Sequence, residues 1–121
     1  MKQAFEDADG RWSEVCAVAE ILPDTGVCCA VAGEQVAVFR YGEGEELYAL
    51  SNFDPFSRAN VISRGIVGDR AGEPKVASPV FKQAFSLKTG LCLDDPSVRL
   101  ATYEVSVKSG LVRVRPRRAD A

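Results

Sequence analysis

A series of short β-forming runs, each ended by a turn, most limits how this 121-residue chain can fold. The clearest runs are residues 101–107 and 111–115, which are joined by a Lys-Ser-Gly turn and predict an antiparallel hairpin. Residues 26–32 and 35–40 predict a second hairpin, because residues 36–40 alternate with the period of two typical of a strand. No amphipathic helix of useful length is indicated. We therefore expect an all-β chain whose antiparallel sheets form a sandwich or a partial barrel.

The middle of the chain contains more turn signals than either end. Residues 52–60 are turn-like around Asp54-Pro55, because aspartate and proline both favour tight turns. Residues 68–74 contain glycines and a proline and predict a second turn. These turns predict a loop-rich region between two more regular β segments.

The length of the chain fits one domain over residues 1–121, and a chain of this size can bury a core without cross-links. We expect the core over about residues 12–115 and a loop-rich subdomain over about residues 52–90. The first ~10 and last ~6 residues are expected to be flexible, as termini usually are.

The charge balance gives no sign of a nucleic-acid or membrane partner, since the net charge is −2. No apolar run reaches the ~18 residues that a membrane helix needs. The acidic N-terminus lacks the apolar stretch of a secretory signal, so we expect a cytoplasmic protein. A C-terminal basic cluster is interpreted as a solvated tail, with a binding patch as the alternative. It consists of Arg113, Arg115, Arg117 and Arg118.

Residues that usually carry catalysis or hold metals are scarce. The chain has no histidine, so the commonest general base is missing, and no serine or cysteine has a recognisable activating partner. The cysteines include no C-x-x-C pair and are interpreted as free, mostly buried thiols rather than ligands. They are Cys16, Cys28, Cys29 and Cys92. Asp94 and Asp95 precede a proline and are expected to cap a turn rather than to act as an acid–base pair.

Six segments point together to one family. They are ILPDTGVC (21–28), EQVAVFR (34–40), ALSNFDPF (49–56), ISRGIV (62–67), VASPVFKQAFSLKTGLCLDD (76–95) and YEVSVKSGLVRVR (103–115). In this order and with this spacing, the chain resembles a Rieske-type domain. Among such domains it resembles most the small subunits of assimilatory NAD(P)H-dependent nitrite reductases. The resemblance implies a Rieske-like fold: a β framework interrupted by a loop-rich subdomain.

The resemblance fails at the cluster ligands. A Rieske centre takes two thiolates on one iron and two imidazoles on the other. Where the family has Cys-Pro-His, this sequence has Asp54-Pro55-Phe56, and where the family has Cys-Pro-x-His, it has Ser78-Pro79-Val80-Phe81. Phenylalanine has no lone pair to offer a metal. Asp54, Phe56, Ser78 and Phe81 are therefore degenerate ligand positions, and we expect no cofactor, metal or catalytic residue in this chain.

Without a cluster, the two loops need another cause to stay together. We expect Phe56 and Phe81 to meet and fill the vacated space, because burial of such a ring contributes roughly 1.5–3 kcal/mol. Asp54 is expected to cap its own turn through backbone N–H groups, and Ser78 to do so more weakly. The loops are thus predicted to be closed by apolar packing.

The resemblance implies an accessory subunit with no activity when isolated. Its partner is the large nitrite reductase subunit, which carries flavin, sirohaem and an iron–sulfur cluster and uses NAD(P)H for the six-electron reduction of nitrite to ammonium. This chain would dock onto that subunit through its loop tip. Phe53, Ile62 and Val80 are candidate contacts, since an interface needs a desolvated apolar centre. Two alternatives stay open: a Rieske-type [2Fe–2S] electron-transfer protein and a free-standing binding or regulatory module.

Overall fold

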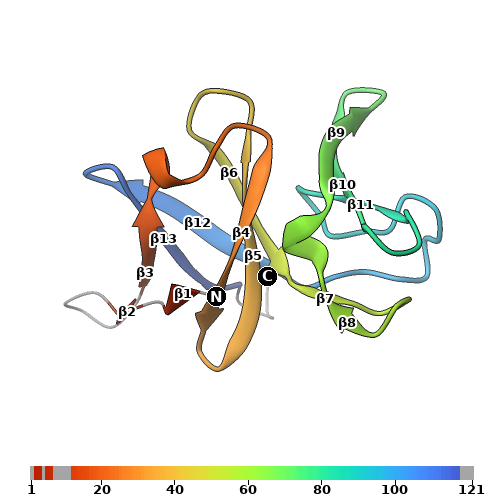
Figure 1. Ribbon diagram of the computed structural model, residues 1–121, viewed down its shortest axis with the longest axis horizontal. Coiled ribbons are helices and arrows are strands. Elements are labelled where there is room, and N and C mark those ends of the chain that lie inside the picture. Colours follow the sequence, from red (N-terminus) through yellow and green to blue (C-terminus); the bar gives the residue numbers. More distant parts are fainter. Residues whose placement is uncertain (1, 4, 7–11, 118–121) are drawn as a thin grey trace.

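The main sheet of the computed structural model, which describes residues 2–3, 5–6 and 12–117, has eight strands in the order β1-β4-β5-β6-β12-β13-β3-β2 (Figure 1). Their bounds are β1 Lys2–Gln3, β2 Phe5–Glu6, β3 Ser13–Ala17, β4 Thr25–Val31, β5 Glu34–Tyr41, β6 Glu46–Ser51, β12 Thr102–Lys108 and β13 Leu111–Pro116. Neighbouring strands are antiparallel, apart from the parallel pair of β1 and β4. The two edge strands, β1 and β2, are separated by one residue of chain. The two edges of the sheet therefore come close together, and the sheet nearly closes into a barrel.

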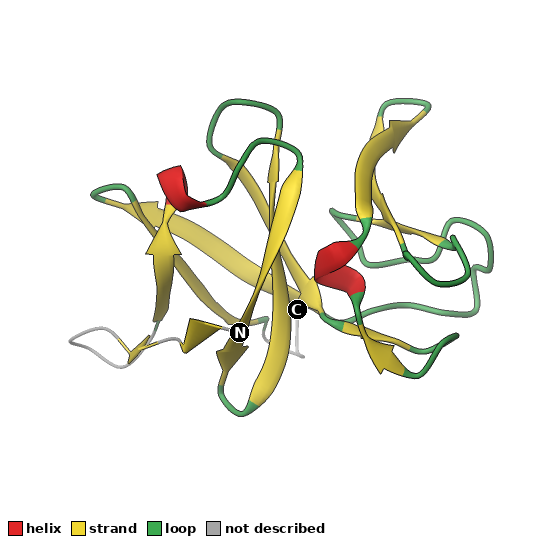
Figure 2. Ribbon diagram, viewed as in Figure 1, coloured by secondary structure: helices red, strands yellow, loops and turns green. Residues whose placement is uncertain are grey.

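Two smaller sheets lie beside the barrel on the loop-rich side (Figure 2). One pairs β9 Ile66–Arg70, β10 Glu73–Ala77 and β11 Ala84–Ser86, and the other pairs β7 Phe53–Asp54 with β8 Ala59–Asn60. Among the described residues, helical structure is limited to the 3-10 turns η1 Val18–Glu20 and η2 Ile62–Arg64, and none of it could cross a membrane. The predicted all-β fold is confirmed.

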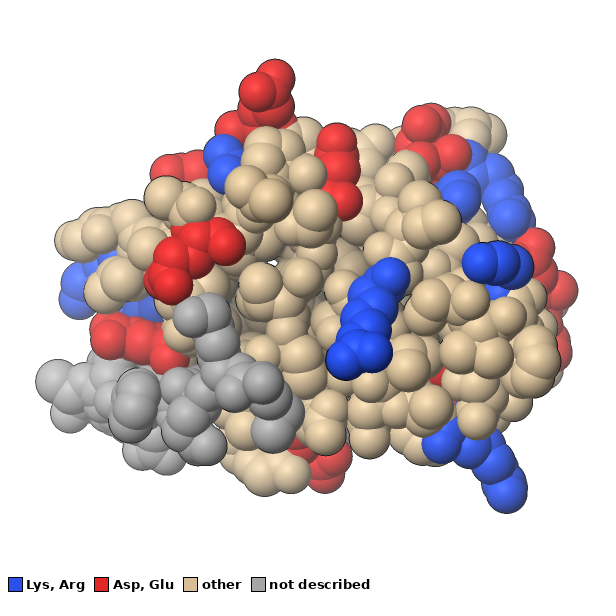
Figure 3. All heavy atoms as spheres, in the orientation of Figure 1, with Lys and Arg blue, Asp and Glu red and all other residues tan. Residues whose placement is uncertain are grey.

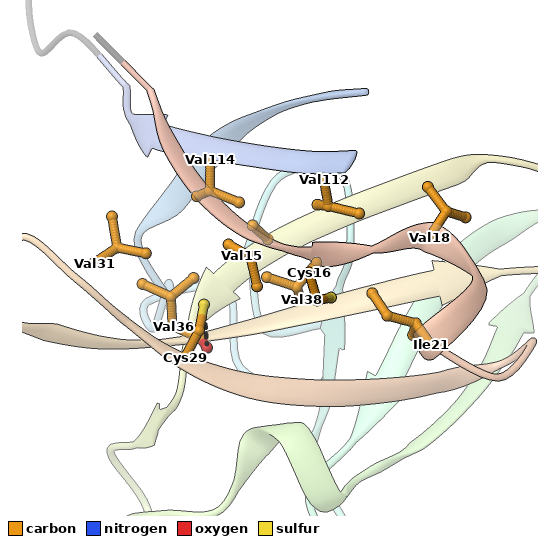
Figure 4. Close-up of a cluster of buried hydrophobic side chains, with 11 residues drawn as sticks. Val15, Cys16, Val18, Ile21, Cys29, Val31, Val36, Val38, Val112 and Val114 are labelled. Atoms are coloured by element: carbon orange, nitrogen blue, oxygen red, sulfur yellow. Dashed lines mark hydrogen bonds between the residues drawn. The ribbon is translucent and has the colours of Figure 1, made fainter. Parts of the chain in front are cut away.

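Strand β5 separates two hydrophobic cores. Val36 and Val38 face the barrel interior, where they meet buried residues of β3, β4 and β13 (Figure 4). Ala37 and Phe39 face the other way, toward the loop-rich half, and share a core with Ile62 of η2. The sequence predicted at least one buried face for this strand, and both faces are buried. β5 thereby ties the loop-rich half to the barrel.

The turn predicted over residues 68–74 is much shorter in the structure. β9 continues to Arg70 and β10 begins at Glu73, so only Ala71 and Gly72 form the turn. Both residues have positive φ angles, 52° and 86°, which suit a tight two-residue hairpin turn. The prediction was wrong because glycine and proline are frequent in turns, whereas here Gly68 and Pro74 lie inside paired strands.

The interpretation of the C-terminal arginines as a solvated tail was wrong for two of them. Arg113 and Arg115 lie in β13, and their guanidinium carbons lie 5.0 and 4.1 Å from the centre of the Trp12 ring. Arg115 also forms an ion pair with Glu104 at 3.2 Å. The regular alternation of β13 places both arginines on the strand face opposite the barrel core. Arg118 and most of the terminal residues expected to be flexible lie outside the described part of the chain.

Candidate functional site: two matched loops

The first loop with degenerate ligand positions is a turn between β7 and β8. Asp54 is fully buried, and its backbone carbonyl accepts a hydrogen bond from the Arg58 N–H at 2.7 Å, which closes the turn. Its Oδ1 accepts from the backbone N–H of Phe56 at 2.9 Å, and its Oδ2 accepts from the Ser57 hydroxyl at 2.9 Å. Asp54 thus caps its own turn, as the sequence predicts.

The second loop, between β10 and β11, repeats this pattern of hydrogen bonds. Ser78 is fully buried, its carbonyl accepts from the Lys82 N–H at 3.2 Å, and its Oγ accepts from the Val80 N–H at 3.3 Å. In each loop a proline follows the buried polar residue, and the closing residue has a left-handed backbone. The φ angle is 59° at Arg58 and 69° at Lys82. Residues 54–58 and 78–82 are called the matched loops below.

A buried hydrogen bond joins the matched loops. The Ser78 hydroxyl donates to Asp54 Oδ2 at 2.6 Å, and neither residue is exposed to solvent. Hydrogen bonds to a charged acceptor are shorter and stronger than neutral ones. The bond connects the two positions at which the family has thiolates. It is therefore a hydrogen-bonded cross-link at the place where a cluster would otherwise connect the loops.

The surroundings of Asp54 favour its ionised form. Burial is the largest single influence and acts to raise the pKa of Asp54. Hydrogen bonds from Ser78, Phe56 and Ser57 together outweigh burial, so the pKa of Asp54 lies below its ordinary value of 3.8. Three donors thus compensate the buried charge, as a charge taken out of water requires. With the carboxylate ionised, Ser78 must be the donor of the bond that joins the loops.

The two phenylalanines at the degenerate imidazole positions do not pack together. Phe56 is partly buried, and its ring packs against that of Phe85 with centroids 6.2 Å apart. Phe81 is 58% exposed. The prediction that Phe56 and Phe81 meet and close the loops was wrong, because the bond between Asp54 and Ser78 closes them instead. Phe81 is left on the outer part of its turn.

The residues present do not fit a Rieske cluster. The two phenylalanines offer no lone pair, and the carboxylate and hydroxyl at the thiolate positions are already bonded to each other. Iron–sulfur clusters take thiolates, whereas Cys92 is fully buried within the hydrophobic core of the loop-rich half. In the part of the chain that the structure describes, no three histidine, cysteine, aspartate or glutamate side chains converge into a metal-binding group.

The cysteines are free, and three of the four are buried, which confirms their interpretation as mostly buried thiols. Burial, together with the neighbouring Cys28 and Cys16, raises the pKa of Cys29 to about 12. Burial also raises the pKa of the partly exposed Cys28. The thiolate is the reactive form of cysteine, so both side chains are protonated and unreactive at neutral pH.

Two of the three candidate contact residues are exposed. Phe53, in β7 directly before the first matched loop, is 42% exposed, and Val80 is 45% exposed. Phe81 adds a third large exposed apolar side chain. Ile62 is fully buried and belongs to the core between β5 and the loop-rich half. Its prediction as a surface contact was wrong, because η2 directs this side chain inward. The contact role of Phe53 and Val80 stays a prediction.

Asn52 gives no special signal in the sequence, yet it holds the loop-rich half against the barrel. Its side-chain amide is buried and donates hydrogen bonds to Gln35 Oε1 at 3.1 Å and to Cys28 Sγ at 3.4 Å. Its Oδ1 accepts from the Ser63 N–H at 2.7 Å. One side chain thus bridges β4, β5 and η2, which fixes the orientation of the neighbouring Asp54 loop.

Arg58 and Lys82 are two further residues of the site. The residue types alone do not identify them, but a repeated sequence pattern does. The five-residue segments DPFSR (54–58) and SPVFK (78–82) share a proline at the second position and a cation at the fifth. Such a repeated pattern predicts two turns of the same type.

Comparisons with known proteins identify the family to which this chain belongs. The sequence model of the Rieske-like [2Fe-2S] domain family matches residues 11–115. The NADH nitrite reductase small subunit of Escherichia coli (strain K12) is 44% identical over 105 residues, which are 87% of this chain and 97% of that protein. A crystal structure from Mycobacterium tuberculosis, described as an NADH-dependent nitrite reductase small subunit, superimposes with a TM-score of 0.83 and 45% identity. That match covers 89% of this chain and 96% of the other.

One further match is to part of a large subunit and not to a whole small subunit. The nitrite reductase [NAD(P)H] large subunit of Klebsiella oxytoca is 38% identical over 103 residues, which are 85% of this chain but only 11% of that protein. In Klebsiella oxytoca, a segment similar to this chain is therefore one part of a much longer polypeptide.

Proposed function

Because this chain belongs to the Rieske-like [2Fe-2S] domain family and, within it, to the nitrite reductase small subunits, we propose that it is the accessory subunit of a nitrite reductase. In this proposal the large subunit binds NAD(P)H, flavin, sirohaem and an iron–sulfur cluster and reduces nitrite to ammonium. The small subunit associates with it and supports turnover in nitrate assimilation. A cytoplasmic location belongs to the same proposal.

The similarity to the Klebsiella oxytoca protein supports a physical association between the two subunits. There, a segment like this chain occupies 11% of a polypeptide named as a nitrite reductase large subunit. Two domains that occur in one chain in one organism are well suited to contact each other when they are separate chains in another.

We propose further that the small subunit supplies no catalytic group. The Asp54 carboxylate is buried and takes part in three hydrogen bonds, so it is not available as an acid or base. Burial raises the pKa of Cys28 and Cys29, which keeps both thiols protonated. The contribution of the chain to the reaction is then to bind and stabilise the large subunit.

The exposed apolar side chains on and next to the matched loops are the proposed contact surface. Phe53, Val80 and Phe81 are large apolar side chains that are between 42% and 58% exposed. Aromatic residues in the centre of an interface commonly supply most of its binding energy. The matched loops are also held firmly, since the bond between Ser78 and Asp54 joins them. A rigid apolar surface loses little entropy on binding.

The test is a binding measurement with the purified large subunit. The wild-type chain is expected to bind and to co-elute with it in size-exclusion chromatography. Phe53→Ala and Phe81→Ala should each weaken binding by about 1 kcal/mol or more, because truncating a central aromatic residue of an interface has that effect. Leu22→Ala is the matched control, since Leu22 is 69% exposed but lies in the turn between η1 and β4.

Thermal unfolding of the same variants separates binding from folding. Phe81 is largely exposed, so Phe81→Ala should change the free energy of unfolding by only about 0.5 kcal/mol. A wild-type chain that does not bind the large subunit and does not affect nitrite-dependent NAD(P)H oxidation would overturn the proposed function. Equal binding by Phe53→Ala, Phe81→Ala and Leu22→Ala would overturn the contact surface alone.

A further inference from the structure

The matched loops end in two cations whose backbone conformation is unusual. Arg58 and Lys82 close their turns with φ angles of 59° and 69°, in the left-handed region. A residue with a Cβ atom in this region costs roughly 1–2 kcal/mol, and glycine avoids the cost. In the three hairpin turns that begin at Ala32, Ala71 and Ser109, a glycine with positive φ follows and completes the turn. Arg58 and Lys82 have no such neighbour.

Residues that are held in a strained backbone conformation are frequent at functional sites. Each loop could close its turn with glycine at lower cost, because the closing hydrogen bond comes from the backbone N–H. Both loops instead have a long basic side chain at that place. The formation of the turns therefore does not account for the basic side chains of Arg58 and Lys82.

The two cations have no ionic partner within the described part of the chain, and both are exposed. The Lys82 ammonium donates one hydrogen bond of 3.3 Å to the Pro79 carbonyl of its own loop. The only carboxylate in the matched loops belongs to Asp54, which is buried and bonded to Ser78. The exposed charge of the matched loops is thus positive, although the chain as a whole has a net charge of −2. In the space-filling view, basic side chains project from the lower right, over the end where β7 and β8 lie (Figure 3).

We propose that Arg58 and Lys82 bind carboxylates on the large subunit that border an apolar docking surface. The inference rests on the proposed function, and it specifies the chemistry of the partner surface. Stable interfaces combine an apolar centre with a polar rim of complementary charge. Here Phe53, Val80 and Phe81 are the apolar centre, and the two cations, one on each loop, are the rim. The bond between Ser78 and Asp54 joins the two loops that carry these cations.

The test compares charge reversal, charge removal and a remote control in binding to the purified large subunit. Arg58→Glu and Lys82→Glu should each lower the affinity roughly tenfold at low salt, mostly through a slower association rate, because rim charges act on encounter. The difference should shrink as salt increases, since salt screens exposed charges. Lys108→Glu reverses an exposed cation at the end of β12 and should leave the affinity within about twofold of the wild type.

Arg58→Gly and Lys82→Gly distinguish a binding role from a folding role. Glycine relieves the left-handed strain, so neither variant should be less stable than the wild type in urea unfolding. Both should still bind the large subunit more weakly, with the salt dependence reduced. A variant that is equally stable and yet binds less well is not explained by damage to the fold.

The outcomes separate the inference from the proposed function. If the wild type binds the large subunit and the glutamate variants bind as well or better, the basic rim is overturned while the proposed function stands. If the affinity of the wild type does not depend on salt, the basic rim is also overturned. If the wild type does not bind at all, both the proposed function and the inference are overturned.

Discussion

The hydrogen bond from Ser78 to Asp54 joins loops whose anchoring residues are 24 positions apart in the chain. Both residues are fully buried, so water cannot replace the bond once it is lost. A buried carboxylate that loses one of its hydrogen-bond donors lowers the stability of the fold. The matched loops are therefore expected to be sensitive to small changes at these two side chains.

Ser78→Ala should lower the free energy of unfolding by about 1–3 kcal/mol, because it leaves the buried carboxylate of Asp54 with one donor fewer. In urea unfolding, Ser97→Ala is the control, since it removes an exposed hydroxyl that donates to Asp95 at 2.6 Å and should cost about 0.5 kcal/mol or less. A double-mutant cycle with Asp54→Ala should give a coupling energy of about 0.5–3 kcal/mol. A loss no greater than that of Ser97→Ala would contradict a structural role for the bond.

Acid should weaken the same connection. The pKa of Asp54 is lowered in the folded chain, so the unfolded chain binds the proton more readily. The contribution of Asp54 to stability is then present above the ordinary value of 3.8 and is lost as the pH falls below it, through the folded pKa. In urea unfolding between pH 6 and pH 3, the stability difference between the wild type and Asp54→Asn should shrink toward low pH. A difference that stays constant across this range would contradict the ionised, hydrogen-bonded Asp54.

The sequence predicted these residues only in part. The repeated proline and the family pattern identify Asp54, Phe56, Ser78 and Phe81 as one group, and the turn-capping role of Asp54 is confirmed. The bond between Asp54 and Ser78 could not be read from the sequence, because it depends on how β7 and β10 approach each other in three dimensions. The expected pairing of Phe56 and Phe81 failed for the same reason.

At the scale of strands and turns, the loop-rich half is held to the barrel at the crossing of β4, β5 and η2. Gly26 of β4 makes this close approach possible: a Cβ atom there would lie 2.6 Å from the Phe39 ring and 2.9 Å from the Ser63 carbonyl oxygen. Asn52 bonds to Gln35 and Ser63 at the same junction. The position of the matched loops relative to the barrel thus depends on a small residue and a buried amide.

Gly26→Ala should lower the free energy of unfolding by about 1–3 kcal/mol, because the added methyl group overpacks a tight junction. Gly68→Ala is a matched control in strand β9, since nothing lies within 4 Å of the added Cβ atom. The measurement is the midpoint of urea unfolding for both variants. Equal midpoints would contradict a close contact between β4 and η2.

Local patterns predicted some elements well and others poorly. The closing hairpin of β12 and β13 follows from alternation and a glycine turn, and it is found with nearly the predicted ends. The β9–β10 hairpin was assigned as a turn, because Gly68 and Pro74 are locally turn-forming and only the pairing of the two strands shows otherwise. The cation–π contacts of Arg113 and Arg115 with Trp12 join β13 to the start of β3, which no local pattern reveals.

For the whole molecule, the fold of a Rieske domain is kept while the residues of its cluster site are replaced by a hydrogen bond and exposed apolar side chains. The barrel supports the matched loops through the shared strand β5, which is buried on both faces. In the proposed function, the matched loops offer a rigid surface for the large subunit. We propose that these loops contact the large subunit and do not hold a cluster.

The most direct test is an assay of iron and acid-labile sulfide after anaerobic reconstitution with both. A rebuilt chain with Asp54→Cys, Phe56→His, Ser78→Cys and Phe81→His restores the family's ligands and is the positive control, expected to hold about two irons and two sulfides per chain. The wild-type chain is expected to stay colourless, without stoichiometric iron or sulfide. A wild-type chain that turns brown and holds about two irons and two sulfides would contradict the proposal that these loops hold no cluster.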